Sequence, residues 1–167
     1  AQFESREVEK VYHALVLGNP RWDERVIDAP LLPDGDRKHR TVVDPKDGKP
    51  SVTNLKVLRR VKGVTLVEAR PETGRTHQIR VHLATAGSSI ACDPLYGDGK
   101  PLLLSSFKKN YRVTEAHIER PLLGRLGLHA VSLSFAHPVS GERVTYEAAY
   151  PKDFGATLNQ LGKSSVA

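Results

Sequence analysis

Residues 70–82 read RPETGRTHQIRVH and lie where an apolar run, residues 64–69, gives way to a helical pattern. The run predicts a strand, the Thr-Gly pair at 73–74 predicts a turn, and residues 76–86 predict a helix that stops at Gly87. A glycine just before a helix lets the backbone approach a ligand closely, and the free N–H groups of the first helical turn attract anions. The stretch therefore predicts a strand–turn–helix unit with an anion-binding turn. The alternative is an ordinary turn with a charged, solvated face.

Strand patterns flank this unit on both sides. Residues 51–60 and 64–69 alternate loosely around a turn at Gly63, which predicts a hairpin. A second hairpin is predicted where two alternating runs meet at the turn 137–141. The predicted strands are, in chain order, residues 10–17, 26–29, 40–43, 51–60, 64–69, 88–92, 127–136 and 143–149.

Only two segments have a clear helical pattern. Residues 76–86 place Ile79, Leu83 and Ala86 on one face, and residues 151–161 begin with a proline, which suits the first turn of a helix. Because the helices are few and interrupt runs of hairpins, the sequence predicts an α+β fold, with a mixed, largely antiparallel sheet and helices packed on it. The length of 167 residues suits one domain.

The composition is that of an ordinary globular protein with an excess of positive charge. Lys and Arg number 25 against 19 Asp and Glu, a formal net charge of +6. This excess favours a polyanionic partner such as nucleic acid, although many basic proteins bind none. No segment has the roughly 18 consecutive apolar residues of a membrane span. The single cysteine, Cys92, excludes an internal disulfide and suits a reducing compartment, so we expect a cytoplasmic protein.

Five blocks of sequence occur here in the order found in one enzyme family. They are residues 10–18 (KVYHALVLG), 48–53 (GKPSVT), 73–82 (TGRTHQIRVH), 93–98 (DPLYGD), and 128–130 with 137–138 (LHA and HP). On these blocks the chain resembles the RluA-type RNA pseudouridine synthases over nearly all of residues 8–150. The resemblance implies the pseudouridine synthase fold and an isomerase that converts uridine in structured RNA, ribosomal or transfer, into pseudouridine.

The resemblance also implies roles for two residues. In the family an aspartate is the nucleophile, a tyrosine stacks on the flipped base and an arginine pairs with the aspartate; Tyr12 matches the tyrosine and Arg80 the arginine. An enzyme that acts on a base must take it out of the stack, so it needs a pocket with an aromatic face and cations for the phosphates. A guanidinium fork suits a carboxylate, and a tyrosine offers a ring face plus a hydroxyl. Taken singly, Tyr12 suits the core of a strand and Arg80 the surface of a helix.

Basic side chains outside this pair predict where RNA binds. Two of them lie at the predicted helix start, where phosphate is attracted. Others belong to the basic run 37–40, to the block 48–53, or to residues 100–120, which form a basic, irregular insertion within the domain. The alternative for each run is a solvated loop. The residues expected to bind RNA are Arg40, Lys49, Arg75, His77, Lys108 and Lys109.

The sequence predicts neither a metal site nor a cofactor. His77 and His82 lie five residues apart, about 140° round a helix, so they do not share a face. No pattern of Cys, His or carboxylate with metal-ligand spacing occurs elsewhere, and neither does a phosphate loop or a nucleophile elbow. The isomerisation that the resemblance implies involves no redox change.

The aspartate motif of the family does not occur in these 167 residues. In the family it is of the His-Arg-Leu-Asp type and lies upstream of the segment that matches residues 10–18. Asp93 is expected to be a turn acceptor rather than a catalyst. The chain also contains no methionine, even at position 1. We therefore expect residues 1–167 to be a single partial catalytic domain whose N-terminal portion is missing and which is inactive alone.

Missing early strands would leave an open sheet edge, so we expect a second chain or self-association to cover it. Two alternatives to an enzyme of this family stay open. One is a non-catalytic RNA-binding fragment of the same fold. The other, based on composition alone, is a small β-rich hydrolase that uses His and Asp, which predicts a serine, a cysteine or a metal beside His77 or His82.

Overall fold

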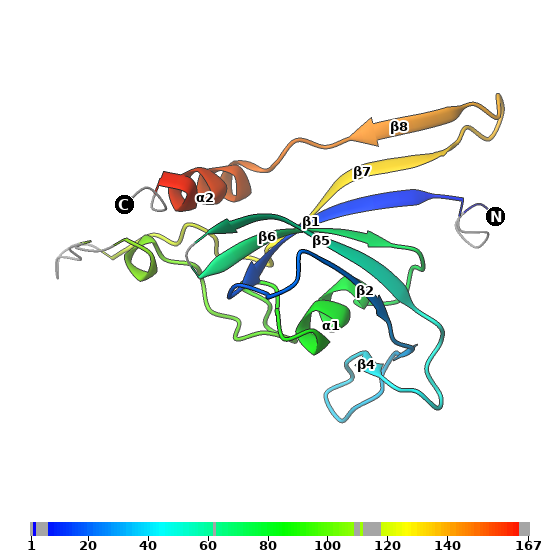
Figure 1. The fold of residues 1–167 in the computed structure, drawn as a ribbon, viewed down its shortest axis with the longest axis horizontal. Helices are drawn as coiled ribbons and strands as arrows, with labels where there is room; N and C mark the ends of the chain where they lie inside the picture. The colour runs from blue at the N-terminus through cyan, green and yellow to red at the C-terminus, as the bar shows by residue number, and fades with distance from the viewer. Residues whose placement is uncertain (1, 3–6, 62, 109–110, 112–117, 164–167) are drawn as a thin grey trace.

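The chain forms a six-stranded antiparallel sheet with a helix packed on each face. The computed structural model describes residues 2, 7–61, 63–108, 111 and 118–163. The sheet order is β2-β5-β6-β1-β7-β8, and every adjacent pair of the described strands runs antiparallel (Figure 1). The expected α+β fold with a largely antiparallel sheet is confirmed. The elements are β1 (Glu9–Leu17), β2 (Glu24–Asp28), β3 (Leu31–Leu32), β4 (Val42–Val43), β5 (Val52–Val61), β6 (Val64–Pro71), α1 (Gln78–Thr85), the short 3-10 helix η1 (Leu104–Ser106), β7 (Leu128–Ala136), β8 (Arg143–Glu147) and α2 (Lys152–Lys163).

Alternation of side chains along β1 decides which helix covers which face of the sheet. Leu15 belongs to the apolar cluster that contains Phe154 of α2. Val16, the next residue, belongs to the separate cluster that contains Leu83 of α1. In Figure 1 the two helices accordingly lie on opposite sides of the sheet. Helix α1 therefore rests on a core of its own, and burial of that core fixes its position.

Helix α1 is shorter than predicted and begins at Gln78. His77, directly before it, has a φ of 53°, in the left-handed region, so regular helical geometry does not extend back to Thr76. At the other end Gly87 has a φ of 74° and its N–H donates to the carbonyl of Ala84. The predicted glycine stop is confirmed.

Two predicted strands are wrong in extent. Residues 88–92 make only a single bridge, between Ile90 and Val16, because Cys92 turns the backbone with a φ of 60°. Of residues 40–43 only β4 pairs, with β3, in a two-stranded ribbon separate from the main sheet. Both predicted hairpins, β5–β6 and β7–β8, form.

Strand β1 lies between β6 and β7, and its register with β7 shifts between Val11 and Tyr12. The extra residue, Val131, lies on β7, and a bulge bends the strand that carries it. Tyr12 pairs with Ala69 on one side and Ala130 on the other. Two small neighbours therefore flank the Tyr12 ring on the sheet.

The outer strands β2 and β8 have no second neighbour in the described part of the chain. Each exposes a large apolar side chain: Val26 is 63% exposed and Tyr146 is 61% exposed. Within the insertion, residues 109–110 and 112–117 lie outside the described residues. Among the helices that the structure describes, none has the length and apolar character needed to cross a membrane.

Candidate active site

Tyr12 and Arg80 line the same pocket, which has a volume of about 540 Å³. It lies between β1 and the start of α1, and the turn after β6 closes one side. Its apolar lining comes from Tyr12, Ile79, Leu126 and Leu128, and its cations are Lys10, Arg75 and Arg80. None of the described residues that line it is acidic. The pocket thus combines an aromatic and aliphatic wall with a cationic rim.

Arg80 is held by a carboxylate from outside the helix. Its Nε and Nη2 donate to the two carboxylate oxygens of Asp93 at 2.8 and 2.7 Å. Asp93 is fully buried, and it also accepts the backbone N–H groups of Leu95 and Tyr96. Burial by itself would raise the pKa of the Asp93 carboxyl, but the bonds from Arg80 and the two N–H groups together lower it. Asp93 is therefore ionised as well as being the turn acceptor that the sequence predicted.

Gln78 ties the turn to the sheet beneath the pocket. Its Oε1 accepts the hydroxyl of Thr73 at 2.7 Å and the backbone N–H of Arg75 at 3.0 Å. Its Nε2 donates to the Val52 carbonyl at 2.9 Å and to the hydroxyl oxygen of Thr53 at 3.0 Å. Gln78 is only 4% exposed, so these bonds replace water at every polar atom of its side chain. The shape of the turn therefore depends on this amide.

His82 lies in the same buried layer and is not free to hold a ligand. The Ala29 carbonyl can only accept, so the contact of 3.0 Å with Nε2 places a proton on that nitrogen. Nδ1 then accepts the hydroxyl of Thr53 at 2.9 Å. Burial lowers the pKa of the His82 imidazole and keeps it neutral. His82 is thus a structural residue that joins α1 to β5.

His77 contacts Tyr96 at the edge of the pocket. His77 Nδ1 lies 3.0 Å from the Tyr96 hydroxyl, and the two rings meet edge to face. The Arg80 guanidinium lies over the Tyr96 ring, 5.0 Å from its centroid. Burial lowers the pKa of His77, and the charge of Arg80 lowers it further. Neither histidine contacts a serine or a cysteine among the described residues, and no metal-binding group of His, Cys, Asp and Glu occurs among them, so the hydrolase alternative has no support.

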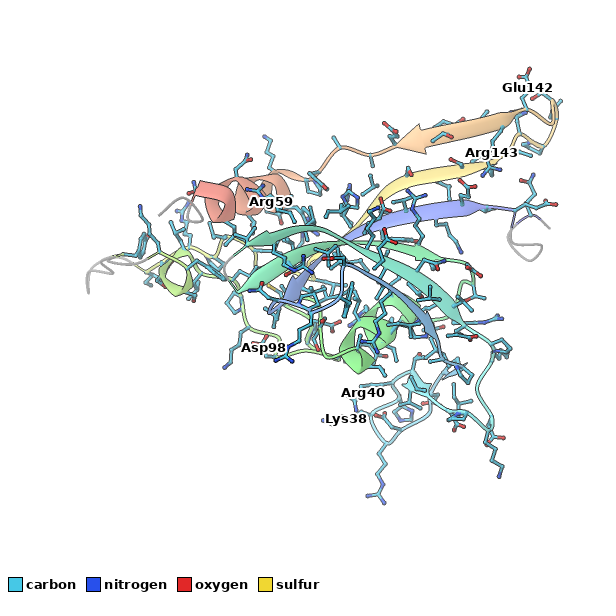
Figure 2. All side chains as sticks on the ribbon, viewed as in Figure 1. Lys38, Arg40, Arg59, Asp98, Glu142 and Arg143 are labelled. Carbon is cyan, nitrogen blue, oxygen red and sulfur yellow. The ribbon has the colours of Figure 1, made fainter. Side chains whose placement is uncertain are left out.

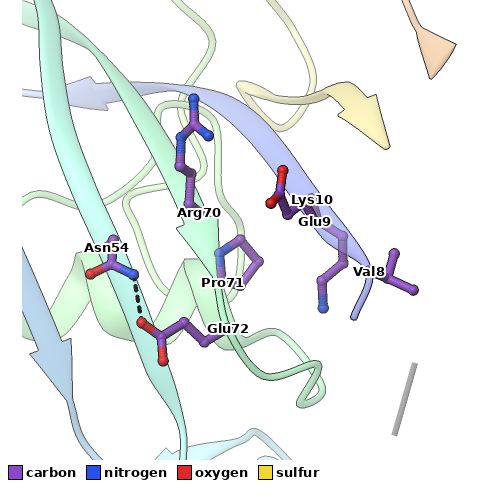
Figure 3. Close-up of a pocket in the computed structure, with 7 residues that line it drawn as sticks. All are labelled: Val8, Glu9, Lys10, Asn54, Arg70, Pro71 and Glu72. Carbon is purple, nitrogen blue, oxygen red and sulfur yellow. Dashed lines mark hydrogen bonds between the residues drawn. The ribbon is translucent and has the colours of Figure 1, made fainter. Parts of the chain in front are cut away.

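Arg75 and Lys10 are the least engaged cations of the rim. Arg75 donates from Nε to the Pro50 carbonyl at 3.3 Å and pairs with no carboxylate in the described part of the chain. Lys10 Nζ donates to the Thr73 carbonyl at 3.3 Å, and partial burial lowers its pKa. Figure 3 shows Lys10 beside a second hollow, of about 280 Å³, which it shares with Arg70 and with a hydrogen-bonded Asn54–Glu72 pair. Arg75 and Lys10 are therefore both positioned to contact an anion in the pocket that they line with Tyr12.

The other basic residues predicted to bind RNA do not line this pocket. Arg40 lies between β3 and β4, on the segment of residues 31–43 that we call the β3–β4 arm (Figure 2). Its Nε donates to Asp36, and its Nη1 donates to the Leu95 carbonyl. Lys49 and Lys108 are exposed and lie outside the pocket lining. Lys109 lies outside the described residues. The pocket lining therefore includes Tyr12, Arg80, Arg75 and His77 but not Arg40, Lys49 or Lys108. Arg40 nevertheless approaches this group, because its guanidinium lies 5.9 Å from the centroid of the Tyr96 ring.

Three residues of the site were not identified from the sequence. Lys10 alternates with Tyr12 on β1, a period-two spacing that places both side chains on one face. Gln78 gave no signal of its burial, because its partners lie on the turn and on β5, up to 26 positions away. Tyr96 gave no signal beyond its place in the block 93–98, because its contacts come from segments far apart in the chain.

A sequence model described as RNA pseudouridylate synthase matches residues 1–85. The ribosomal large subunit pseudouridine synthase D of Zymomonas mobilis is 36% identical over 162 residues, which cover 96% of this chain and 47% of that protein. The ribosomal large subunit pseudouridine synthase C of Vibrio cholerae is 39% identical over 163 residues, 96% of this chain and 46% of that protein. The chain thus spans about half the length of these curated relatives.

Two solved structures of human proteins are similar to the whole described fold. Human RNA Pseudouridylate Synthase Domain Containing 4 superposes with a TM-score of 0.71 at 25% identity, over 96% of this chain and 65% of that one. Human RNA Pseudouridylate Synthase Domain Containing 1 gives a TM-score of 0.69 at 28% identity, over 99% of this chain and 69% of that one.

Proposed function

Because the chain belongs to the RNA pseudouridylate synthase family, we propose that it forms part of the catalytic domain of an enzyme that isomerises uridine to pseudouridine in structured RNA. The observation that carries the proposal is that Tyr12 and Arg80 line one pocket with a cationic rim. The names of the relatives from Zymomonas mobilis and Vibrio cholerae favour ribosomal RNA of the large subunit over transfer RNA as the substrate.

The pocket suits a base that has left its stack. The ring of Tyr12 provides a flat surface against which uracil stacks, and the aliphatic wall excludes water from the other side. Lys10 and Arg75 hold the phosphates that flank the flipped nucleotide. The hydroxyl of Tyr12 has no hydrogen-bond partner in the described part of the chain, so it is available to move a proton. In this reaction the base is detached, rotated and rejoined through C5, whose hydrogen leaves to water.

The nucleophile of this reaction comes from outside these 167 residues. None of the described residues that line the pocket is a carboxylate, and Asp93 already takes the Nε and Nη2 of Arg80 with both its oxygens. The Nη1 of Arg80 has no partner among the residues the structure describes, and it is the group that receives the incoming aspartate. The proposal therefore includes that the chain is inactive alone. A non-catalytic RNA-binding fragment is the alternative, and it predicts that no added segment restores activity.

Release of tritium from RNA labelled at C5 of uridine tests the catalytic role in a protein that contains this chain. Arg80→Lys loses the bidentate fork, so kcat should fall roughly 100-fold while RNA affinity changes little. Arg125→Lys controls for loss of a bidentate pair of the same geometry outside the pocket, at the surface of the chain. Near-normal turnover of Arg80→Lys would refute the role of Arg80.

Substitutions of Tyr12 test the stacking surface separately from the hydroxyl. Tyr12→Phe keeps the ring and should lower kcat without weakening RNA binding. Tyr12→Ala also removes the ring and should weaken binding by about 1–3 kcal/mol. Tyr146 on β8 is 61% exposed and lines an adjacent hollow with Tyr12 and Lys10, outside the pocket that contains Arg80. Tyr146→Phe and Tyr146→Ala therefore distinguish the two hollows. Equal effects at Tyr12 and Tyr146 would refute stacking of the base in the pocket that contains Arg80.

The open sheet edges support a further part of the proposal, that a second chain or a second copy pairs with β2 or β8. Unpaired N–H and C=O groups along an outer strand favour such pairing. Sedimentation of the chain over a range of concentrations measures it, and a monomer throughout would leave these edges exposed to water.

A further inference from the structure

Tyr96 joins three separate segments at the edge of the pocket. Its hydroxyl accepts the backbone N–H of Thr41 at 3.0 Å and contacts Nδ1 of His77 at 3.0 Å. Its ring lies beneath the guanidinium of Arg80. The β3–β4 arm, the turn before α1 and the helix itself therefore meet at one phenol.

The hydrogen count of this phenol fixes the tautomer of His77. A tyrosine hydroxyl has one proton and accepts through its oxygen. The phenol oxygen of Tyr96 already accepts the N–H of Thr41. The hydroxyl proton of Tyr96 therefore makes a hydrogen bond only if His77 Nδ1 accepts it. Nδ1 is then unprotonated, and the proton of a neutral imidazole lies on Nε2. With the opposite tautomer both neighbours would donate to the phenol, and its own proton would have no acceptor among the described residues.

The surroundings of His77 favour the neutral ring over the imidazolium. The guanidinium of Arg80 lies over the Tyr96 ring that His77 contacts, and Arg75 is two residues away in the same turn. The φ of 53° at His77 is a conformation that few side chains adopt, and the contact with Tyr96 secures the side chain there. Nε2 has no partner in the described part of the chain, although the side chain lines the pocket.

We propose that Tyr96 is a positioning residue that fixes His77 as a neutral Nε2–H donor, and that this donor bonds an acceptor oxygen of the RNA in the pocket. The oxygen belongs either to a phosphate or to the base, since both accept a neutral N–H. The RNA part rests on the proposed function, whereas the tautomer is a property of the free chain.

Nitrogen NMR of the imidazole rings in the chain without RNA tests the tautomer directly. His77 should show an unprotonated Nδ1 and a protonated Nε2 near neutral pH. Tyr96→Phe keeps the ring beneath Arg80 and removes only the hydroxyl, so His77 should become a mixture of tautomers. His82 is an internal reference, because its Nε2–H bond to Ala29 does not involve Tyr96. Tyr12→Phe is the matched control and should leave His77 unchanged.

Two results would overturn the positioning role. One is a His77 that carries its proton on Nδ1, or is already a mixture, in the unsubstituted chain. The other is a Tyr96→Phe spectrum in which His77 keeps a single tautomer while His82 reports an intact fold. A Tyr96→Phe chain in which His82 also changes has lost local structure. Thr41→Pro then decides, because it removes the N–H that occupies the phenol oxygen. Either tautomer of His77 can then make one hydrogen bond with Tyr96, so the account predicts a mixture, and a single unchanged tautomer would overturn it.

An RNA stem-loop with uridine in its loop tests the donor. His77→Asn keeps a residue type that tolerates a positive φ but does not reach as far, and it should weaken binding roughly two- to tenfold. Because the lost donor is uncharged, the salt dependence of binding should stay the same, whereas Arg75→Gln should reduce its slope. Unchanged affinity of His77→Asn would refute the donor.

Titration of the labelled chain with inorganic phosphate and with the stem-loop separates the two sources of the oxygen. A shift of His77 Nε2 with phosphate alone assigns the bond to a phosphate oxygen, and a shift with RNA only assigns it to the base. RNA that perturbs Arg75 but not His77 would overturn the inference while the proposed function stands. Failure of tritium release by a complete protein would remove the proposed function and leave the tautomer result intact.

Discussion

Two ion pairs of the same geometry lie in very different parts of the molecule. Arg80 bonds both oxygens of Asp93 at 2.8 and 2.7 Å, and Arg125 bonds both oxygens of Asp153 at 2.7 and 2.8 Å. The first pair is buried, with side chains 13% and 0% exposed, whereas the second lies at the surface, with side chains 45% and 39% exposed. Contact geometry alone therefore does not distinguish them.

Burial decides what each pair does. Because water screens Arg125 and Asp153, their ion pair contributes little to the free energy of unfolding. Asp153 lies in the first turn of α2, so the pair joins Arg125 to the start of that helix. Asp93 has no water to replace a lost partner, and two backbone N–H groups depend on it as well. The pair at the pocket thus holds the Arg80 guanidinium in one orientation.

The largest effect is expected from breaking the two pairs in parallel. Asp93→Asn leaves Arg80 as a buried, unpaired charge, so the free energy of unfolding should fall by about 3–5 kcal/mol. Asp153→Asn should lower it by no more than about 1 kcal/mol. Chemical denaturation of the three proteins measures both differences. Equal losses of unfolding free energy would mean that burial does not determine how much each ion pair stabilises the fold.

A smaller effect is expected in the buried layer beneath the pocket. Gln78→Leu leaves the partners of the amide without hydrogen bonds, and the free energy of unfolding should fall by about 2–3 kcal/mol. Asn159→Leu, at an exposed position of α2, is the control and should change it by less than about 0.5 kcal/mol. A tolerated Gln78→Leu would show that water or a local shift replaces the amide.

The pH dependence of stability tests the same layer through His82. Burial lowers the pKa of His82 in the folded chain below its ordinary value of 6.5. As the pH falls below about 6.5 the unfolded chain takes up a proton that the folded chain excludes, so stability is lost on the acid side and is unaffected above it. The loss should therefore grow steadily as the pH falls from 7.5 to 5.5.

His82→Gln isolates that contribution. Glutamine offers one donor and one acceptor and does not titrate, so the variant should lose less stability than the parent on acidification. Denaturation curves at the two pH values give the difference. An identical pH dependence of the two proteins would contradict a buried, neutral His82.

The smallest effects concern RNA binding at the pocket rim and at the insertion. Arg75→Gln should weaken binding and reduce the salt slope by roughly one unit. Charge reversal at Lys108 and Lys109 should also weaken binding and flatten the salt dependence if the insertion contacts RNA. Affinity for a uridine stem-loop across a salt series compares the two. Unchanged binding after the reversal would remove the insertion from the RNA-binding surface.

Local patterns predicted the parts of the fold that depend on neighbouring residues. The hairpin β5–β6, the central strand β1 and the glycine stop at Gly87 all follow from alternation or turn chemistry. The strand expected at residues 88–92 is wrong because the positive φ at Cys92 follows from packing, which no local pattern reports.

The site followed the same division. Tyr12, Arg80, Arg75 and His77 lie together because β1 faces the turn before α1 and the start of that helix. The partnership of Arg80 with Asp93 and the position of Tyr96 were not predicted, since they join residues 13 to 55 positions apart. Arg40 was grouped with the RNA-binding residues on charge alone, whereas the structure engages it with Asp36 and Leu95.

The central claim is that this chain supplies the tyrosine and the arginine of a pseudouridine synthase site and that the nucleophile lies elsewhere. Release of tritium from RNA labelled at C5 of uridine tests it most directly, with the chain alone and with an added segment that carries the aspartate motif of the family. The account predicts binding without release by the chain alone, and release once the segment is added. Release by the chain alone would contradict it, because a nucleophile would then lie within these 167 residues.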